Sequence, residues 1–177
     1  DDVRVRPDWL AKVWAAFQQW TWVDYVGGKV LPRWPRTPPD WLTEQHWAPL
    51  ALLDYGPNVR EVNADWAPCM VGANFAVRRK VFERVGLFHP LFQHRHGSCS
   101  AVEDHEWQYR ALVAGSVGAY VPDIVIEAAV QPNRLDRAYH RKWHLDHGRA
   151  VVPIDPLEAV LRERRGLQGK SRFGWWP

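Results

Sequence analysis

GANFAVRRKVFERVGLF (residues 72–88) is the segment with the clearest pattern of secondary structure. Its apolar first part, together with the residues just before it, predicts a short buried strand at 70–77. A helix is predicted immediately afterwards at 79–85, because valine and phenylalanine recur there at helical spacing and Gly86 can end the helix. A strand that leads directly into a helix is typical of an α/β domain.

Segments on both sides of this stretch repeat the alternation of strand and helix. The prolines and tryptophans of residues 32–41 instead predict an irregular loop or lid. The S-x-x-E spacing of Ser100 and Glu103 predicts a capping box, and Gly115 and Gly148 are expected helix ends. Strands are expected at 23–31, 117–121 and 124–129, and helices at 9–17, 42–53, 101–114, 134–147 and 157–165.

Composition indicates one globular α/β domain, residues 1–150, followed by a partly helical tail, residues 151–177. The 177 residues are 46% hydrophobic and 24% charged. The mean hydropathy of -0.41 comes without the ~20 consecutive apolar residues that a spanning helix needs. Two cysteines suit a reducing compartment. We therefore expect a cytoplasmic protein without a transmembrane segment, one that can act at the membrane surface.

Arginine and tryptophan are the two residue types in excess. Arginine supplies 18 of the 23 basic residues, which suits anionic ligands but equally a solvated surface. The twelve tryptophans suit stacking on sugars or nucleic acid bases, although core anchoring is their commoner use. Four basic side chains share the spacing of one helical face, and they are Arg134, Arg137, Arg141 and His144.

Two acidic positions have the character of site residues. Asp104 begins the helix predicted at 101–114, where a carboxylate can accept a proton but is also favoured by the helix dipole. Its neighbour Glu103 is assigned first to the capping box. Asp1 and Asp2 lie at an expected strand exit, where carboxylates can bind a hard divalent cation or simply be solvated.

Five segments resemble, in order, motifs of family 2 glycosyltransferases with the GT-A fold. They are DDVRVRPDWL (1–10), VGGKVLP (26–32), GANFAVRRKVFERVGLF (72–88), EDHEW (103–107) and the basic stripe within 134–144. The first resembles the end of the family's Asp-rich metal motif, the third its Gly-x-Asn segment and the fourth its Glu-Asp motif. The third is the most distinctive, and the resemblance covers residues 1–150.

This resemblance implies a role for each matched position. Asp1 and Asp2 would hold Mg²⁺ or Mn²⁺ on the donor diphosphate, and Asp104 would be the general base. Residues 127–130 lack the histidine that many relatives direct at the metal, so the implied metal ligation is incomplete. The remaining positions would contact substrate, and they are Gly72, Asn74, Glu103, Trp107, Arg134, Arg137 and Arg141.

The implied protein is a truncated GT-A type α/β domain, with a mixed sheet flanked by helices and the nucleotide-binding front half absent. The parent enzyme would transfer a sugar, with inversion, from a nucleotide-sugar donor to a hydroxyl of a carbohydrate or lipid-linked acceptor. This segment alone would be inactive. Asp2 and Asp104 would have to face a common cleft, and the interpretation depends on this spatial expectation.

Two other functions are open on the sequence. The tryptophan-rich loop and the arginines could build a non-catalytic module that binds carbohydrate or nucleic acid. Alternatively, another chain could complete a half-domain by supplying the missing strands. A zinc site at His94, His96 and Cys99 is not favoured, because no paired ligand frame accompanies them. We expect no specific nucleic acid partner.

Overall fold

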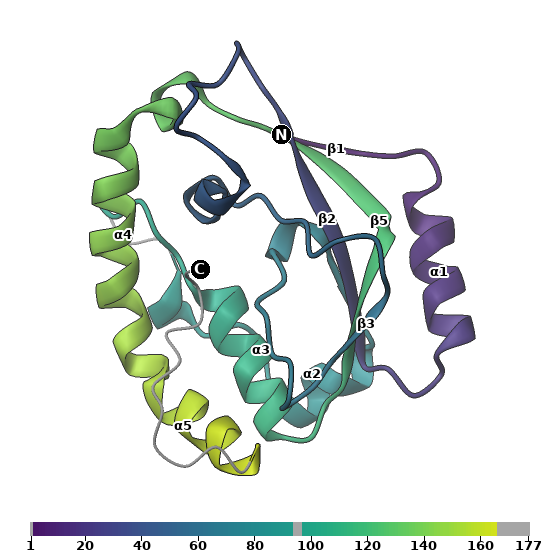
Figure 1. Ribbon diagram of the computed structural model, residues 1–177. Helices are drawn as coiled ribbons and strands as arrows, with labels where there is room; N and C mark the ends of the chain where they lie inside the picture. Colours follow the sequence, from purple (N-terminus) through teal and green to yellow (C-terminus); the bar gives the residue numbers. More distant parts are fainter. Residues whose placement is uncertain (1, 94–96, 166–177) are drawn as a thin grey trace.

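The computed structural model describes residues 2–93 and 97–165 of the chain (Figure 1). Helices and strands are interspersed along it, with short 3₁₀ turns in the longer connections. The strands are β1 (Val3–Val5), β2 (Tyr25–Arg33), β3 (Arg60–Val62), β4 (Phe75–Val77) and β5 (Gly118–Ala129). The helices are α1 (Trp9–Gln19), α2 (Arg79–Val85), α3 (Glu103–Val113), α4 (Arg137–Val151) and α5 (Asp155–Arg164).

One mixed sheet forms the centre of the molecule. The strand order is β1-β5-β2-β4, and β3 also pairs with β5. β2 and β5 are parallel, whereas β1, β3 and β4 run antiparallel to their partners. Helix α1 packs on one side of the sheet, and the other helices lie on the opposite side (Figure 1). The expectation of a mixed α/β sheet flanked by helices is therefore confirmed.

Side chains of β2 and β5 alternate between two hydrophobic clusters, one on each face of the sheet. Tyr25 and Tyr120 belong to the larger cluster, with residues of α2, α3 and α5, whereas their neighbours Val26 and Ala119 pack with residues of α1. All four side chains are buried. This alternation follows from the two-residue period of a strand. Both faces of the sheet are covered, which is why these strands are apolar almost throughout.

β5 is one continuous strand, although the sequence predicts two strands separated at Pro122. Between Gly27 and Lys29 of β2, the partner on β5 moves from Tyr120 to Val125, so two steps along β2 correspond to five along β5. The extra residues of β5 leave the ladder as a bulge, beyond which pairing resumes. A proline is tolerated within the strand because it lies at this bulge.

Gly28 and Asn74 join the two strands at the bulge. A Cβ atom at Gly28 would lie 1.9 Å from the carbonyl oxygen of Ile124, so only glycine fits there. The Asn74 side chain donates hydrogen bonds to the carbonyl oxygens of Lys29 (2.8 Å) and Ile124 (2.9 Å). Its own oxygen accepts one from the indole N–H of Trp9 (2.7 Å). Asn74 therefore ties β2, β5 and α1 together.

Two helix predictions are wrong in the connections. The helix expected at 42–53 is replaced by two 3₁₀ turns, Glu44–His46 and Ala48–Leu50. Ala51 then takes a left-handed backbone conformation with φ of 53°, which a helix cannot continue through. Gly148 does not end a helix, because α4 runs past it. Packing of α4 along the domain therefore overrides the tendency of Gly148 to end the helix.

Other elements agree with the prediction more closely. α2 has the predicted bounds 79–85, and Gly86 follows it with φ of 85°. α5 covers most of the predicted 157–165. The strand expected at 70–77 is shorter, because a 3₁₀ turn at Gly72–Asn74 precedes β4. This turn brings the backbone of the Gly-x-Asn segment towards α3.

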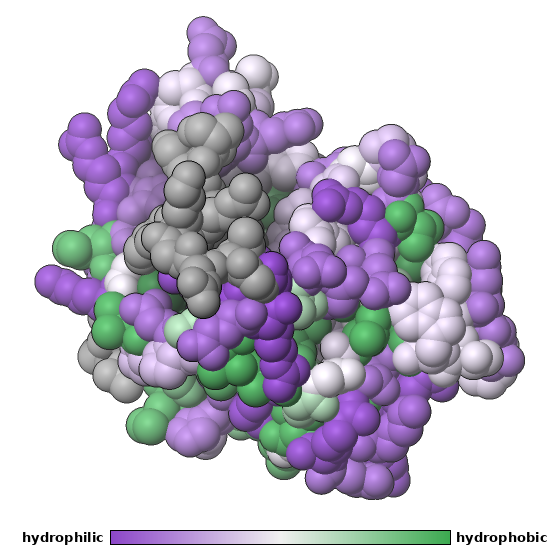
Figure 2. All heavy atoms as spheres, turned by 60° about the horizontal axis from the view of Figure 1, so that its bottom comes forward, coloured by the Kyte–Doolittle hydropathy of each residue, from purple (hydrophilic) through white to green (hydrophobic). Residues whose placement is uncertain are grey.

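Apolar side chains reach the surface in separate groups among hydrophilic residues on the face shown in Figure 2. The most exposed large ones come from different elements, for example Leu10 and Trp14 of α1, Leu87 after α2 and Leu145 of α4. Within residues 2–93 and 97–165, no helix combines the length and the apolar character needed to cross a membrane.

Candidate functional site

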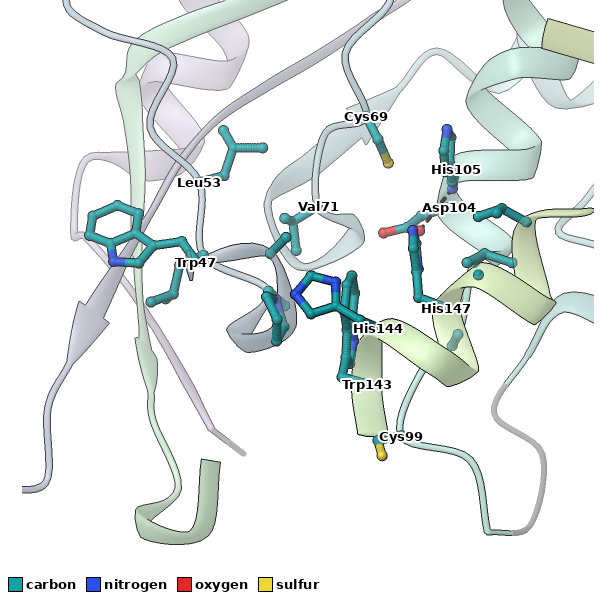
Figure 3. A pocket seen from close by; sticks show the side chains of 18 of the residues that line it. Trp47, Leu53, Cys69, Val71, Cys99, Asp104, His105, Trp143, His144 and His147 are labelled. Atoms are coloured by element: carbon teal, nitrogen blue, oxygen red, sulfur yellow. Dashed lines mark hydrogen bonds between the residues drawn. The ribbon is translucent and has the colours of Figure 1, made fainter. Parts of the chain in front are cut away.

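A cavity of about 650 Å³ lies on the side of the sheet that carries α3 and α4 (Figure 3). Its wall comes from three parts of the chain that are far apart in sequence, within residues 44–55, 99–109 and 134–158. Cys69 and Val71 complete the lining. Small-molecule sites typically have volumes of roughly 300–1,000 Å³. We therefore take this cavity as the candidate site.

Asp104 lies at the start of α3, with its carboxylate at the cavity wall (Figure 3). Oδ2 accepts a hydrogen bond from the backbone N–H of Gly72 at 2.9 Å, and Oδ1 accepts one from that of His105 at 2.8 Å. Burial raises the pKa of the Asp104 carboxyl; the Gly72 N–H opposes this rise, and the charge of Glu103 adds to it. A carboxylate with a raised pKa is a stronger base than a solvated one.

Gln108 holds together the two segments that meet at Asp104. It lies one helical turn after Asp104 and is 1% exposed. Its Oε1 accepts a hydrogen bond from Met70 N at 2.8 Å, and its Nε2 donates to the Met70 carbonyl at 2.7 Å and to the Asp104 carbonyl at 3.0 Å. This pairing fixes the backbone before Gly72 against α3, so that the Gly72 N–H points at the carboxylate.

The predicted capping box of Ser100 and Glu103 does not form. Val102 is the N-cap of α3, and no side chain caps the helix. The Ser100 hydroxyl lies 3.1 Å from Nδ1 of His147 instead. Glu103 is the first helical residue and lines the cavity, where its Oε2 is buried and accepts no hydrogen bond from the described residues. Its position is therefore that of a site residue and not of a cap.

The thiol of Cys69 faces the same part of the cavity as Asp104 (Figure 3). Burial raises the pKa of this thiol well above its usual value, and the charge of Asp104 raises it further. Its sulfur lies 3.5 Å from Nε2 of Gln108. Because the thiol stays protonated at neutral pH, Cys69 contributes a small, weakly polar surface and not a nucleophile.

Three histidines line the cavity from α3 and α4, namely His105, His144 and His147. Burial lowers the pKa of His105 to about 4, with a further contribution from His147. Burial also lowers the pKa of His147 to about 4, with a contribution from His144. The pKa of His144 is lowered by burial and by His46. At pH 7 these rings are neutral, so they supply aromatic surface and ring nitrogens but no positive charge.

Aromatic rings form much of the remaining wall. Trp143 stacks on His147, with ring centroids 4.3 Å apart and an angle of 11° between the rings. Tyr139 donates its hydroxyl hydrogen to the carbonyl of Pro49 at 3.1 Å. Trp47 lies on the side of the cavity away from Asp104 (Figure 3). The cavity thus combines acidic groups with aromatic faces, a combination suited to sugar-like ligands.

Asn74 and Trp107 are buried parts of the fold, and this corrects their prediction as substrate contacts. Asn74 is 1% exposed, and its amide is used at the bulge between β2 and β5. Trp107 is 0% exposed and packs among Tyr25, Phe75 and other rings of the core. Its indole N–H donates to the Gly86 carbonyl at 2.8 Å. Neither side chain can reach a ligand without unpacking the core.

The basic stripe is not a single helical face, because Arg134 precedes α4. It belongs to a 3₁₀ turn, Pro132–Leu135, and lines the cavity. Arg137 stacks on Trp41 instead, with its guanidinium carbon 4.8 Å from the ring centroid, and neither Arg137 nor the exposed Arg141 belongs to the cavity lining. The prediction of substrate contact thus agrees with the position of Arg134 and disagrees with the other two.

The predicted metal ligands do not lie in this cavity. Asp1 falls outside the described residues. Asp2 is exposed, its backbone carbonyl accepts a hydrogen bond from Ala129 N at 2.7 Å, and it does not line the cavity. Within the described ranges, no three or more His, Cys, Asp or Glu side chains are arranged to hold a metal ion. The common cleft expected for Asp2 and Asp104 is therefore not found there.

The disfavoured zinc cluster is tested only at one of its members. His94 and His96 lie outside the described residues. Cys99 is engaged with α4, because both its backbone N–H (2.9 Å) and its thiol (3.3 Å) donate to Oδ2 of Asp146. This carboxylate also accepts from Lys142 at 2.5 Å. Cys99 therefore attaches its loop to the helix.

Sequence reasoning missed the buried Gln108, which holds the backbone beside Asp104, and several wall residues, among them Trp47, Trp143 and His147. Gln108 follows Asp104 by four positions, so the same helical face could have been searched for a partner. Trp143 and His147 are likewise four apart on α4, a spacing that predicts contact between their rings. No helical spacing pointed to Trp47, because it lies between two 3₁₀ turns that the sequence pattern does not predict.

Comparison with known proteins adds no relative. No protein-family model matches the chain, and a search of curated proteins finds none with significant similarity to it. Its function is therefore inferred from the residues of the cavity and from the motifs that meet there, which resemble those of family 2 glycosyltransferases.

Proposed function

We propose that this chain is the acceptor-side part of an inverting, nucleotide-sugar-dependent glycosyltransferase of the GT-A type, with Asp104 as its general base. The observation that carries the proposal is the hydrogen bond from the Gly72 N–H to Asp104 at the cavity wall. It joins the two motifs with the clearest resemblance, the Gly-x-Asn segment and the Glu-Asp motif, which are 32 residues apart.

The proposed reaction needs one proton to be taken from the acceptor. The acceptor oxygen attacks the anomeric carbon of the donor sugar, the bond from that carbon to the diphosphate breaks on the opposite face, and the hydroxyl proton passes to Asp104. Two backbone N–H groups orient this carboxylate, from Gly72 and His105. Burial raises its pKa. Orientation and basicity are the two properties that a general base requires.

The donor side of the proposal is contradicted in one respect, because Asp2 and Asp104 were expected to face a common cleft and Asp2 does not line the cavity. The proposal therefore rests on the acceptor side alone, on Asp104 and its contact with Gly72. Asp2 is exposed and stands away from the cavity lining, so it does not by itself form a site that fits Mg²⁺ or Mn²⁺, and we derive no step through a metal. In the proposal, the nucleotide-sugar is bound by a segment that precedes Asp1 or by a second chain. Metal binding by Asp1 and Asp2 stays a prediction, to be tested by comparing Mn²⁺ affinity of the chain with that of Asp2→Ala.

The test of the proposed function is Asp104→Asn in a protein that combines this chain with the nucleotide-binding segment. We expect the turnover number to fall by a factor of about 10²–10⁴, because the general base is removed while the side-chain shape is kept. The wild-type rate should rise with pH as Asp104 ionises, and the variant should lack this rise. Release of nucleoside diphosphate in the presence of hydroxyl acceptors is the measurement.

Asp65→Asn is the matched control, because Asp65 is exposed and does not line the cavity. This variant should keep the wild-type turnover and pH profile. Normal turnover of Asp104→Asn, with the circular dichroism spectrum of the wild type, would remove Asp104 from the role of base.

A non-catalytic carbohydrate-binding module is the second candidate. The stacked Trp143 and His147 at the cavity favour it, because flat aromatic surfaces bind sugar rings without chemistry. The same variant separates the two functions. A binding module would release no nucleoside diphosphate in the wild type and would bind sugars unchanged in Asp104→Asn, whereas the transferase would lose turnover.

A further inference from the structure

We propose that the acceptor bound in this cavity is an uncharged glycoside that carries an apolar or aromatic group, and not a sugar linked through phosphate. The inference rests on the proposed function only in naming the ligand an acceptor. The binding preference itself can be measured without sugar transfer. It narrows the broad class of carbohydrate or lipid-linked acceptors by the shape and charge of the cavity wall. Three observations on the wall support it.

The first observation is that apolar side chains lie across the cavity from Asp104. Asp104 and Cys69 lie on one side in Figure 3, and Trp47 and Leu53 lie on the other. Val71, which precedes the 3₁₀ turn Gly72–Asn74, lies between them. A ligand that places a hydroxyl at Asp104 therefore extends over apolar side chains. A fully hydroxylated ligand would leave its hydroxyls without partners there, which is unfavourable.

The second observation is the aromatic platform on α4. Trp143 is only partly buried, lines the cavity, and is held in place by the parallel ring of His147 at 4.3 Å. The His147 ring is itself fixed, because its Nδ1 lies 3.1 Å from the Ser100 hydroxyl. Trp143 also contacts the ring of His144, with centroids 5.1 Å apart and an angle of 85° between the rings. A lining ring held in this way can contact a sugar ring or an aryl group with little loss of side-chain freedom on binding.

The third observation is the charge of the wall. Among the described residues, the lining carries six carboxylates and one guanidinium, that of Arg134. Two of the carboxylates have basic partners outside the lining, since Asp54 pairs with Lys29 at 2.8 Å and Glu158 pairs with Arg162 at 2.8 Å. For the other four acids, Glu44, Glu103, Asp104 and Asp155, the described residues supply no such partner.

Histidine does not offset this negative charge. The lining histidines are neutral at pH 7, because burial lowers the pKa of His105 and of His147 to about 4 and also lowers that of His144. An anionic ligand would therefore meet four acids and one arginine, and its phosphate would be repelled. An uncharged ligand avoids this repulsion and keeps the stacking contact.

The experiment is calorimetric titration of the 177-residue chain at pH 7 and low salt with three kinds of probe. These are phenyl glycosides of glucose, galactose and mannose, the corresponding methyl glycosides, and phenyl phosphate. We expect at least one phenyl glycoside to bind about tenfold more tightly than its methyl counterpart, because one stacked aryl group is gained. Phenyl phosphate should bind more weakly than that glycoside and should gain affinity as salt is added.

Trp143→Ala and Trp14→Ala form a matched pair of variants. Trp143 lines the cavity, whereas Trp14 is 66% exposed on α1 and lies outside it. The first should weaken phenyl glycoside binding by about tenfold, and the second should leave it unchanged. Trp143→Phe keeps a ring and should retain most of the affinity for the phenyl glycoside. This variant replaces Trp143→Ala in the experiment if the alanine variant does not fold.

Three outcomes would overturn the inference. They are tighter binding of phenyl phosphate than of every phenyl glycoside, equal binding of phenyl and methyl glycosides, and absence of binding by all probes. The proposed function fails separately. Phenyl glycoside binding that is kept in Asp104→Asn, together with unchanged turnover in that variant, would refute the base while leaving the ligand preference intact.

Discussion

The two faces of the sheet bury polar groups in different ways. On the α1 side, the side chain of Asn74 joins α1 to the strands and has hydrogen bonds to three partners. On the side of α3 and α4, the core opens into the cavity, where the pKa of Asp104 is raised and that of His105 is lowered. Satisfied polar groups serve the fold, whereas perturbed titratable groups beside a cavity are candidates for function.

Among the substitutions that test this comparison, Gly28→Ala should lower the free energy of unfolding most. Its Cβ would lie 1.9 Å from a backbone oxygen of β5, so the two central strands would have to separate. We expect a loss of about 4 kcal/mol or more, or no folded protein. Gly148→Ala is the matched control, because no atom lies within 4 Å of its added Cβ in α4. It should stabilise the protein by about 0.5–1 kcal/mol in urea unfolding. If Gly28→Ala and Gly148→Ala changed the stability similarly, the close approach of Gly28 to the Ile124 carbonyl oxygen would be contradicted.

Asn74→Ala should follow, with a loss of about 3 kcal/mol. It leaves the carbonyls of Lys29 and Ile124 and the indole N–H of Trp9 without their partner, and each such buried group costs about 1–3 kcal/mol. Asn58→Ala, at an exposed position, should stay within about 0.5 kcal/mol of the wild type. If both variants unfold at the same urea concentration, Asn74 does not join the strands as described.

The cavity face should instead respond to acid. The pKa of His105 is about 4 in the folded protein and 6.5 ordinarily, so the unfolded chain binds more protons between these values. The stability from the neutral ring is complete above pH 6.5 and is lost as the pH falls towards 4. We expect this loss to be about 3 kcal/mol for His105.

His105→Phe tests this loss, because it keeps a ring against Tyr109, at 4.4 Å, without a titrating group. Unfolding free energies at a series of pH values should diverge from the wild type below pH 6.5 and run parallel above it. Parallel curves throughout would show that burial does not hold His105 neutral.

The smallest effect should come from Gly72→Pro, which removes one N–H donor to Asp104. Val71 already has the extended conformation, φ -66° and ψ 128°, that a residue before proline requires. The stability should fall by about 1 kcal/mol, and the pKa of Asp104 should rise further, because the Gly72 N–H lowers it. Gly72→Ala keeps the donor and places a Cβ 3.4 Å from Oδ2 of Asp104, so it should raise that pKa less than the proline does. Carboxyl ¹³C titration by NMR distinguishes the two, and equal titration curves would refute the contact.

Much of the fold could be predicted from the sequence because its signals are local. The bounds of α2 follow from apolar spacing over one short segment and from the glycine that ends it. The start of α3 near Asp104 was predicted from the S-x-x-E spacing of Ser100 and Glu103, and the helix is there although the capping box does not form. The helix at 42–53 was predicted wrongly, because its apolar spacing does not reveal that Ala51 turns the chain into a left-handed conformation.

The candidate site could be predicted only in part. Local patterns were enough to predict an α/β sheet and a helix that begins near Asp104, since periodicity and helix ends depend on neighbouring residues. The burial of Trp107 and Asn74, the stacking of Arg137 away from the cavity and the place of Trp143 in its lining are known only from the folded chain. The physical reason is that the environment of a side chain is set by segments distant in sequence, whose packing no local pattern records.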